Sequence, residues 1–299
     1  MSKNSNNALV FIDTNIILDF YRYPNGSAVT SALKHIDENH EKIITSTQVE
    51  MEYKKNRQKI ITQSESKVQA PNKQALNVPV ILENLQAKKM IDTHLDEIKK
   101  QSKKLTKKIE KILTNPKGHD DVYKTVQRLF KNGSALNLKR PDEVRFEIRE
   151  LAQKRFILGY PPRKNSDNSI GDAINWEWVI YCASKFKTDV VIVSRDTDYG
   201  CNFNGEMIIN DWLLQEFKER VGRKELILTN KLMRGFKLAG ISVKQEEVKQ
   251  ENTFLELEER SKKTIEDDDA FFDSPEYSEW LEKEIINAYE NLDENQESN

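Results

Sequence analysis

The chain has 299 residues and a net charge of −2, with 37% of its residues apolar and 32% charged. Its longest apolar run covers only residues 8–12. That is far short of the ~20 residues that cross a bilayer, so we expect no contact with a membrane. Residues 1–7 lack the apolar stretch of a signal peptide, and two cysteines are too few for a disulfide framework. These features predict a cytoplasmic protein.

The small net charge conceals an uneven distribution of charge. Residues 251–299 carry 17 acidic and four basic side chains, whereas residues 1–250 carry 43 basic and 32 acidic ones. A body with a balance of +11 is suited to a polyanion such as nucleic acid, and the acidic end could compete for the same surface. The alternative is that both excesses of charge serve only to keep the protein in solution.

Apolar runs alternate with segments of helical periodicity along most of the chain. Before residue 70 the pattern predicts strands at 8–12 and 43–44. It predicts helices from residue 15 to 21, from 27 or 30 to 36, and from a cap at 46 or 47 to beyond 60. After residue 162 it predicts helices at 170–186, 211–221 and 230–239 and buried strands at 189–194, 206–209 and 225–228. Such alternation is typical of an α/β fold with a central parallel sheet.

Residues 71–160 interrupt this alternation and read as a helical insertion. Further helices are expected at 121–131 and 142–155, after a long amphipathic pattern at 76–113. One arc of that pattern is apolar and should pack, with Ile91, Leu95, Ile98, Leu105, Ile109 and Ile112. The opposite side is a lysine ridge of Lys99, Lys100, Lys103, Lys104, Lys107, Lys108 and Lys111.

The lysine ridge has two interpretations. It could be the solvated face of an amphipathic helix, or it could follow a phosphate backbone. A nuclease site nearby would favour the second interpretation. The expected contacts to nucleic acid on the ridge are Lys100, Lys103, Lys104, Lys107 and Lys111.

The composition becomes polar and acidic after residue 244. We therefore expect a domain at 1–244 and, at 245–299, an acidic linker followed by an amphipathic helix that starts at Ser274. This C-terminal helix carries Trp280, Leu281, Ile285 and Tyr289. The segment could be a disordered solubilising tail, but its aromatic residues favour docking on the basic body or on a partner subunit.

Four acidic residues stand where the predicted elements would bring them together. Asp13 ends the first strand, Asp196 follows the strand that ends at 194, and Asp172 lies in the first turn of a helix. Glu52 lies one turn into the helix after the second strand, where Glu50 competes with it for the same role. Because ligands bind outside the carboxyl ends of parallel strands, we expect these carboxylates to converge.

Such a cluster needs a counter-charge, because like charges a few ångströms apart cannot all stay ionised. An all-oxygen site without cysteine or histidine suits Mg²⁺ or Mn²⁺ and argues against zinc. A divalent ion there would activate water and offset charge on a phosphoryl oxygen, which is the chemistry of phosphodiester hydrolysis.

Other residues near these positions have open roles. Asp198 is either a further metal ligand or a loop cap. Asn15 and Ser194 could hold the carboxylates by hydrogen bonds, although capping is the alternative for Asn15. Lys164 and Arg195 are candidate phosphate contacts.

Four segments in this order resemble the motifs of PIN-domain nucleases. They are residues 11–15 (Phe-Ile-Asp-Thr-Asn), 46–53 (Ser-Thr-Gln-Val-Glu-Met-Glu-Tyr), 171–173 (Gly-Asp-Ala) and 193–199 (Val-Ser-Arg-Asp-Thr-Asp-Tyr). The length and the helical insertion resemble larger bacterial members, some of which belong to phage-defence loci. The resemblance implies a Rossmann-like PIN domain and a Mg²⁺- or Mn²⁺-dependent endonuclease, with RNA favoured over DNA as substrate.

The resemblance to a nuclease raises the question of how its activity is restrained. A nuclease would endanger its host unless restrained, so we expect either a regulatory partner protein or self-association through the C-terminal helix. The rival is a catalytically inactive nucleic-acid-binding or scaffold protein on a PIN-like fold. Each motif alone also has a simple structural interpretation, since Asp13 could merely cap the following helix.

Overall fold

The structure is a computed structural model that describes residues 7–23, 26–69, 78–82, 84–162 and 169–257. The chain up to Val248 forms one compact unit, and Lys249 begins a second unit. The predicted C-terminal helix lies outside the described residues. No described helix combines the length and the apolar character needed to pass through a bilayer.

A five-stranded sheet organises the first unit, and all its strands run parallel, as predicted. The strand order is β3-β2-β1-β4-β7. The strands are β1 (Leu9–Ile12), β2 (Ile43–Ser46), β3 (Asn137–Leu138), β4 (Val190–Val193) and β7 (Leu226–Thr229). Because the strands are parallel, the residues after Ile12, Ser46 and Val193 all leave the sheet at one edge.

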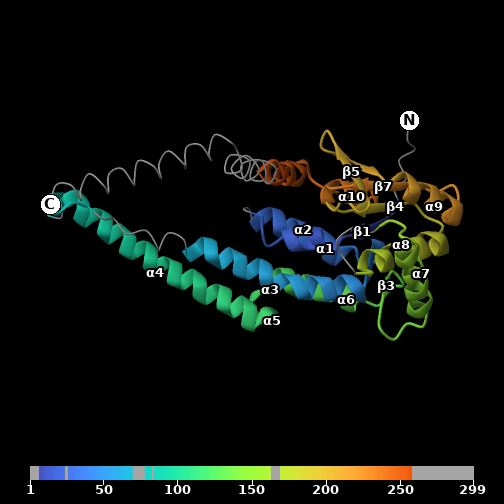
Figure 1. The fold of residues 1–299 in the computed structure, drawn as a ribbon, viewed down its shortest axis with the longest axis horizontal. Helices are drawn as coiled ribbons and strands as arrows, with labels where there is room; N and C mark the ends of the chain where they lie inside the picture. Colours follow the sequence, from blue (N-terminus) through green and yellow to red (C-terminus); the bar gives the residue numbers. More distant parts are fainter. Residues whose placement is uncertain (1–6, 24–25, 70–77, 83, 163–168, 258–299) are drawn as a thin grey trace, which may run out of the picture. The chain divides into compact units, whose positions relative to one another are not determined.

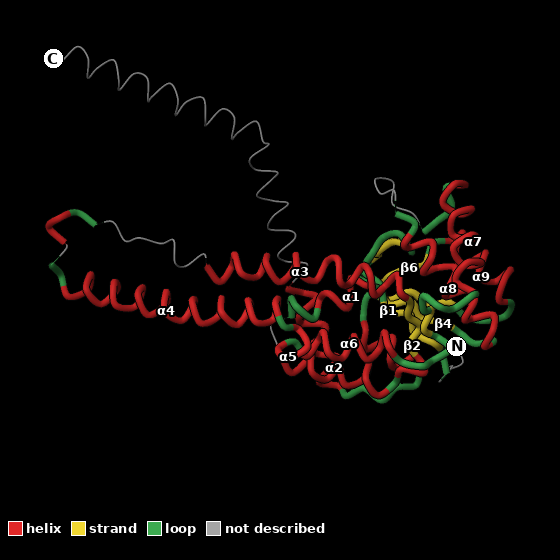
Figure 2. Tube along the Cα trace, turned by 90° about the horizontal axis from the view of Figure 1, so that it is seen from below, coloured by secondary structure: helices red, strands yellow, loops and turns green. Residues whose placement is uncertain are grey.

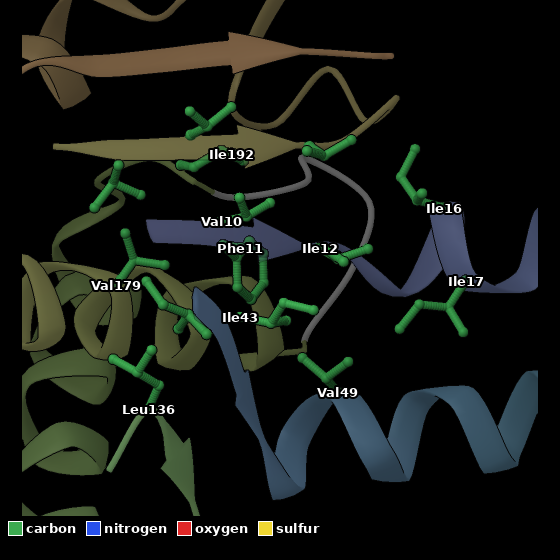
Figure 3. Close-up of a cluster of buried hydrophobic side chains, with 14 of the residues drawn as sticks. Val10, Phe11, Ile12, Ile16, Ile17, Ile43, Val49, Leu136, Val179 and Ile192 are labelled. Carbon is green, nitrogen blue, oxygen red and sulfur yellow. The ribbon is translucent and has the colours of Figure 1, made fainter. Parts of the chain in front are cut away.

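The sheet is buried on both faces, which explains why its strands are apolar without alternation. Val10 and Phe11 of β1 are completely buried and point to opposite sides of the strand (Figure 3). On the Val10 side lies α10 (Leu232–Leu238), whose Gly235 packs so closely that an added Cβ would meet Val193 at 2.5 Å. The Phe11 side faces Val179 of α8 (Gly171–Phe186).

The remaining helices of the sheet domain follow the predicted pattern closely. α9 begins where expected because the Asn210 side chain accepts hydrogen bonds from the backbone N–H groups of Trp212 and Leu213. The other helices flanking the sheet are α1 (Thr14–Asp19), α2 (Gly26–Glu38), α3 (Thr47–Gln69) and α9 (Asp211–Val221).

The helical insertion forms an arm and two further helices. α3 and α4 (Gln86–Thr114) lie side by side along the arm, as both views show (Figures 1 and 2). The long helix begins at Gln86, later than the amphipathic pattern predicted. After the short α5 (Pro116–His119), the chain continues through α6 (Asp121–Lys131) and α7 (Val144–Leu158).

The apolar arc of α4 packs only in part, since Leu95, Ile109 and Ile112 are half-buried. Ile91, Ile98 and Leu105 remain exposed, and Ser102 is the buried residue of this helix. The reason is that α4 contacts α3 on the arm instead of lying on the body of the domain. On the lysine ridge, Lys99 and Lys100 pair with acids one turn earlier, whereas the side chains of Lys103, Lys104, Lys107, Lys108 and Lys111 are exposed.

A buried polar network anchors the arm to the body. Arg57 of α3 forms an ion pair with Asp120, 2.6 Å between Nη2 and Oδ2, and donates a hydrogen bond of 2.8 Å to the carbonyl of Ile112 in α4. The Tyr21 hydroxyl of the body donates to Asp120 at 2.8 Å. Since the Arg57 and Asp120 side chains are 4% and 3% exposed, neither charge has water as an alternative partner.

Two predicted segments differ from expectation. Residues 206–209 are not a buried strand of the main sheet. They form β6 (Glu206–Ile209), which pairs antiparallel with β5 (Gly200–Phe203). Asn204 and Gly205 both have positive φ angles, of 53° and 79°, and such an Asn-Gly turn closes a tight hairpin.

The expected acidic linker is also partly ordered, since residues 245–257 are helical. The helix starts after Lys244 because the Glu247 carboxylate accepts a hydrogen bond of 2.8 Å from the Lys244 backbone N–H. The same carboxylate lies 3.1 Å from His35 Nε2 of α2. Val248 packs against the core.

Candidate active site

Asp13 lies at the carboxyl end of β1 and is held by hydrogen bonds from three sides. Its Oδ1 accepts from the Thr14 backbone N–H at 2.6 Å, so it does cap α1. Its Oδ2 accepts from Ser194 Oγ at 2.5 Å and from Asn15 Nδ2 at 2.9 Å. The side chain is 5% exposed overall. The contacts expected of Asn15 and Ser194 are therefore present.

Glu52 is directed to the same edge by two polar neighbours. Its Oε2 accepts a hydrogen bond from Thr14 Oγ1 at 3.0 Å, and its Oε1 accepts one from Gln48 Nε2 at 2.7 Å. Thr14 thereby links the carboxylates that follow β1 and β2. Glu50, the alternative, instead pairs with Lys54 at 2.6 Å, which favours Glu52 for a role at this edge.

Gly171, the first residue of α8, lies very close to the Glu52 side chain. A Cβ placed on Gly171 would lie 2.2 Å from Glu52 Oε1 and 2.7 Å from Gln48 Nε2. No side chain larger than hydrogen fits at this position without displacing the Glu52 carboxylate. This close approach brings the following residue, Asp172, to the same edge in the first turn of α8.

The fourth acid follows β4. The Asp196 backbone N–H donates a hydrogen bond of 3.0 Å to Ser194 Oγ, the same hydroxyl that donates to Asp13. The turn then leads to Tyr199, a completely buried side chain whose ring contacts Phe11.

Tyr199 reports the convergence of the four acids. Burial raises the pKa of its hydroxyl well above the usual value, and the carboxylates of Asp13, Asp172, Glu52 and Asp196 raise this pKa further. Within the part of the chain that the structure describes, the hydroxyl has no hydrogen-bond partner. Four acids from four separate segments thus lie close enough to act on one atom.

The electrostatics of the cluster favour a positive charge. Burial raises the pKa of Asp13 to about 6, the Ser194 hydrogen bond opposes this rise, and the charges of Glu52 and Asp196 add to it. A nearby cation would favour the ionised form of this carboxylate, which burial above all, and the acidic neighbours in addition, make harder to ionise.

The donor chemistry fits Mg²⁺ or Mn²⁺, because the cluster offers only carboxylate and hydroxyl oxygens. Among the described residues, no three histidine, cysteine, aspartate or glutamate side chains are spaced to hold one ion as they stand. The case for a metal therefore depends on the donor types and on the mutual repulsion of the carboxylates.

Several predicted residues have other surroundings. Arg195 forms an ion pair with Asp19, whose side chain is 3% exposed, so it has a partner inside the protein. Asp198 is partly buried two residues after Asp196. Lys164 lies outside the described residues. The lysine ridge lies on α4 of the arm, whose partner helix α3 carries Glu52 near its start.

Glu177 of α8 joins three helices and has a structural role. It accepts hydrogen bonds from Arg155 Nε at 3.0 Å and from Arg220 Nη2 at 2.7 Å, which joins α7, α8 and α9. The side chain is 2% exposed. It therefore belongs to the packing between these helices and not to the acidic cluster.

Sequence reasoning assigned no role to four neighbours of the acids. Thr14, Gln48, Gly171 and Tyr199 all lie inside the motifs that carried the resemblance. A signal existed for Gln48, because it precedes Glu52 by four residues and so shares its helix face. None existed for the close approach of Gly171, since it depends on contact between helices far apart in the sequence.

Comparison with known proteins gives an independent result. A family profile described as PIN domain matches residues 10–199, which is more than half of the chain. No curated protein and no solved structure matches it. The matched stretch begins in β1 and ends at Tyr199, so it includes Asp13, Glu52, Asp172 and Asp196 and four of the five strands of the parallel sheet. The chain belongs to the PIN-domain family, and its fold is nuclease-like.

Proposed function

We propose that the protein is a metal-dependent endonuclease that hydrolyses phosphodiester bonds of nucleic acid. The residues that would hold the ion are Asp13, Glu52, Asp172 and Asp196, with Asp198 as a further candidate. The observation that carries the proposal is the set of hydrogen bonds through Thr14 and Ser194 that links the segments of Asp13, Glu52 and Asp196.

The neighbours of the acids have a defined part in this proposal. When bound, Mg²⁺ or Mn²⁺ would activate water and offset charge on a phosphoryl oxygen. Ser194 and Asn15 fix the orientation of Asp13, and Thr14 and Gln48 fix that of Glu52. Such outer contacts keep ligands in place and exclude other side-chain conformations.

Nucleic acid is the substrate class that the charge distribution supports. The body of the chain carries an excess of 11 basic side chains, and five lysines of the α4 ridge are exposed. We favour RNA over DNA, because that preference accompanies the resemblance to PIN-domain ribonucleases. A role in antiphage defence, in the cytoplasm and under restraint by a partner protein or by the acidic C-terminal segment, belongs to the same proposal.

Cleavage assays test this proposal against its rival, an inactive nucleic-acid-binding protein. Labelled RNA, single-stranded DNA and double-stranded DNA are incubated with the protein in Mn²⁺ or in EDTA. We expect cleavage of RNA in Mn²⁺ only. Binding of all three without cleavage of any would support the rival.

Matched variants on one helix sharpen the assay. Glu52→Gln should reduce cleavage beyond the ~100-fold that loss of an outer contact costs. Glu50→Gln, two residues away and paired with Lys54 at the surface, should stay within about twofold of the parent. Equal activity of the two variants would remove Glu52 from the site.

A further inference from the structure

A pocket of about 210 Å³ lies beside the acidic cluster and has the opposite charge. Its walls include Arg140, Arg145 and Arg149, and its floor includes Ser46 at the end of β2. Gln48 also lines it, and the same side chain donates a hydrogen bond to Glu52 Oε1. A basic pocket and an acidic cluster thus share a boundary residue.

The fold gathers the three arginines from one stretch of the helical insertion. Leu138 of β3 pairs in register with Ser46, which places the chain after β3 over the end of β2. Arg140 lies two residues after Leu138. Arg145 and Arg149 lie on α7 four residues apart, a spacing that puts both on one helix face. None of these positions belongs to the four motifs at the acidic cluster.

The arginine side chains have no anionic partner among the residues that the structure describes. Arg145 Nε is buried without a hydrogen-bond acceptor, and its guanidinium lies over the Phe146 ring at 4.5 Å. The buried Arg57 and Arg155, by contrast, are paired with Asp120 and Glu177. Three like charges around one small pocket repel each other, and an anion would remove this cost.

The start of α3 adds to the positive character of this pocket. The first N–H groups of a helix have no partner within the helix, and its N-terminus carries partial positive charge. Ser46 Oγ accepts a hydrogen bond from Val49 N–H at 3.3 Å, so one of these donors is satisfied. The pocket opens at this end of a 23-residue helix.

We propose that this pocket binds a phosphate group, namely a backbone phosphate of the nucleic acid near the bond to be cleaved. The location rests on the proposed function, because Gln48 places the pocket directly beside Glu52. Arg140, Arg145 and Arg149 would fix the position of the strand, so that the scissile phosphodiester lies at the acids. They are positioning residues and take no part in the chemistry.

Binding measured without cleavage tests the pocket separately from the nuclease activity. Fluorescence anisotropy of a labelled RNA oligonucleotide is recorded in EDTA for the full chain and for an Arg145→Gln, Arg149→Gln double variant. We expect the dissociation constant to rise at least about tenfold, since each arginine contributes a charge-assisted contact. The fold should persist, because neither side chain has an ion-pair partner among the described residues, and thermal unfolding verifies this.

Arg223→Gln is the matched control. Arg223 is exposed and lies just before β7, at the edge of the sheet opposite to the acids. This control should change the dissociation constant by less than about twofold. If the control weakens binding as much as the double variant does, the loss of any positive charge explains the effect, and the proposal is overturned. No weakening by the double variant would also overturn it.

Two further arms identify the source of the phosphate. Single methylphosphonate linkages are placed one at a time along the oligonucleotide, and one position should abolish the difference between the parent and the double variant. Inorganic phosphate at millimolar concentration should compete weakly. Strong competition by inorganic phosphate, without any sensitive linkage, would assign the pocket to a free phosphate and overturn the backbone assignment. The parent protein could also bind the oligonucleotide without ever cleaving it, while the double variant binds it weakly. That result would overturn the nuclease proposal but support the phosphate pocket.

Discussion

The Cα atom of Gly171 lies so close to the Glu52 carboxylate that a methyl group on it would approach Oε1 to 2.2 Å. The two residues come from helices that start at different strands of the sheet, α8 and α3. Their contact brings Asp172 to the edge where Asp13 and Glu52 already lie. The position of the Glu52 carboxylate therefore depends on the lack of a side chain at Gly171.

Gly171→Ala should therefore impair the site without unfolding the domain. Alanine is favourable in a helix, but its methyl group must displace Glu52 or Gln48. We expect nuclease activity to fall about 10- to 100-fold, as when outer contacts of metal ligands are lost. The measurement is the rate of RNA cleavage together with thermal unfolding of the variant.

Gly26→Ala is the control for this substitution. Gly26 is also the first residue of its helix, and no atom of the described residues lies within 4 Å of a Cβ placed there. The control should keep full activity. If Gly171→Ala is as active as Gly26→Ala, then the close contact has no functional importance.

Asp13 should make the stability of the domain depend on pH in a characteristic way. Its pKa in the folded state is about 6, above the ~3.9 of an unfolded chain. The folded state therefore holds the proton more tightly. The contribution of this group to stability is complete below pH ~4, falls as the pH rises to ~6, and is lost above that range.

Asp13→Asn removes this dependence. The unfolding free energy of the variant minus that of the parent protein should increase by up to ~3 kcal/mol as the pH rises from 4 to 7. Urea unfolding in EDTA at several pH values measures the difference. A difference between the two proteins that stays constant across this range would contradict the raised pKa.

The ion pair at the base of the arm should matter far more than a similar pair at the surface. Arg57→Met leaves the buried Asp120 without its cation, which should cost ~3–5 kcal/mol of unfolding free energy. Arg128→Met breaks an ion pair with Asp37 at the surface, where the Arg128 side chain is 52% exposed and that of Asp37 is 35% exposed. This change should lower the unfolding free energy by ~1 kcal/mol or less. Urea unfolding of both variants at pH 7 decides the matter, and equal losses would refute a special role for burial.

The sequence was sufficient to predict elements whose pattern has a local cause. β1 and β4 are short apolar runs buried on both faces, and α9 starts at a capping asparagine, so all three were predicted correctly. The hairpin of β5 and β6 also had a local signal, the Asn204-Gly205 turn, and was missed because residues 206–209 were interpreted as a strand of the main sheet.

The rest depended on contacts between distant segments. Periodicity marked an apolar arc on α4, but it could not reveal that the helix lies on an arm, where Ile98 and Leu105 stay exposed. The acids could be placed at one edge because parallel strands share their carboxyl ends. Arg145 and Arg149 gave no signal, since only the register of β3 against β2 brings them to the pocket that Gln48 also lines.

The most direct test of the account is the binding of Mn²⁺, measured by isothermal titration calorimetry without any substrate. The parent protein and the Glu50→Gln control should bind the ion equally well. Asp13→Asn, Glu52→Gln, Asp172→Asn and Asp196→Asn should each weaken binding at least about tenfold, because each would remove a charge from one shared site. Binding as tight as that of the parent in these four variants would contradict the claim that the acids hold a cation together.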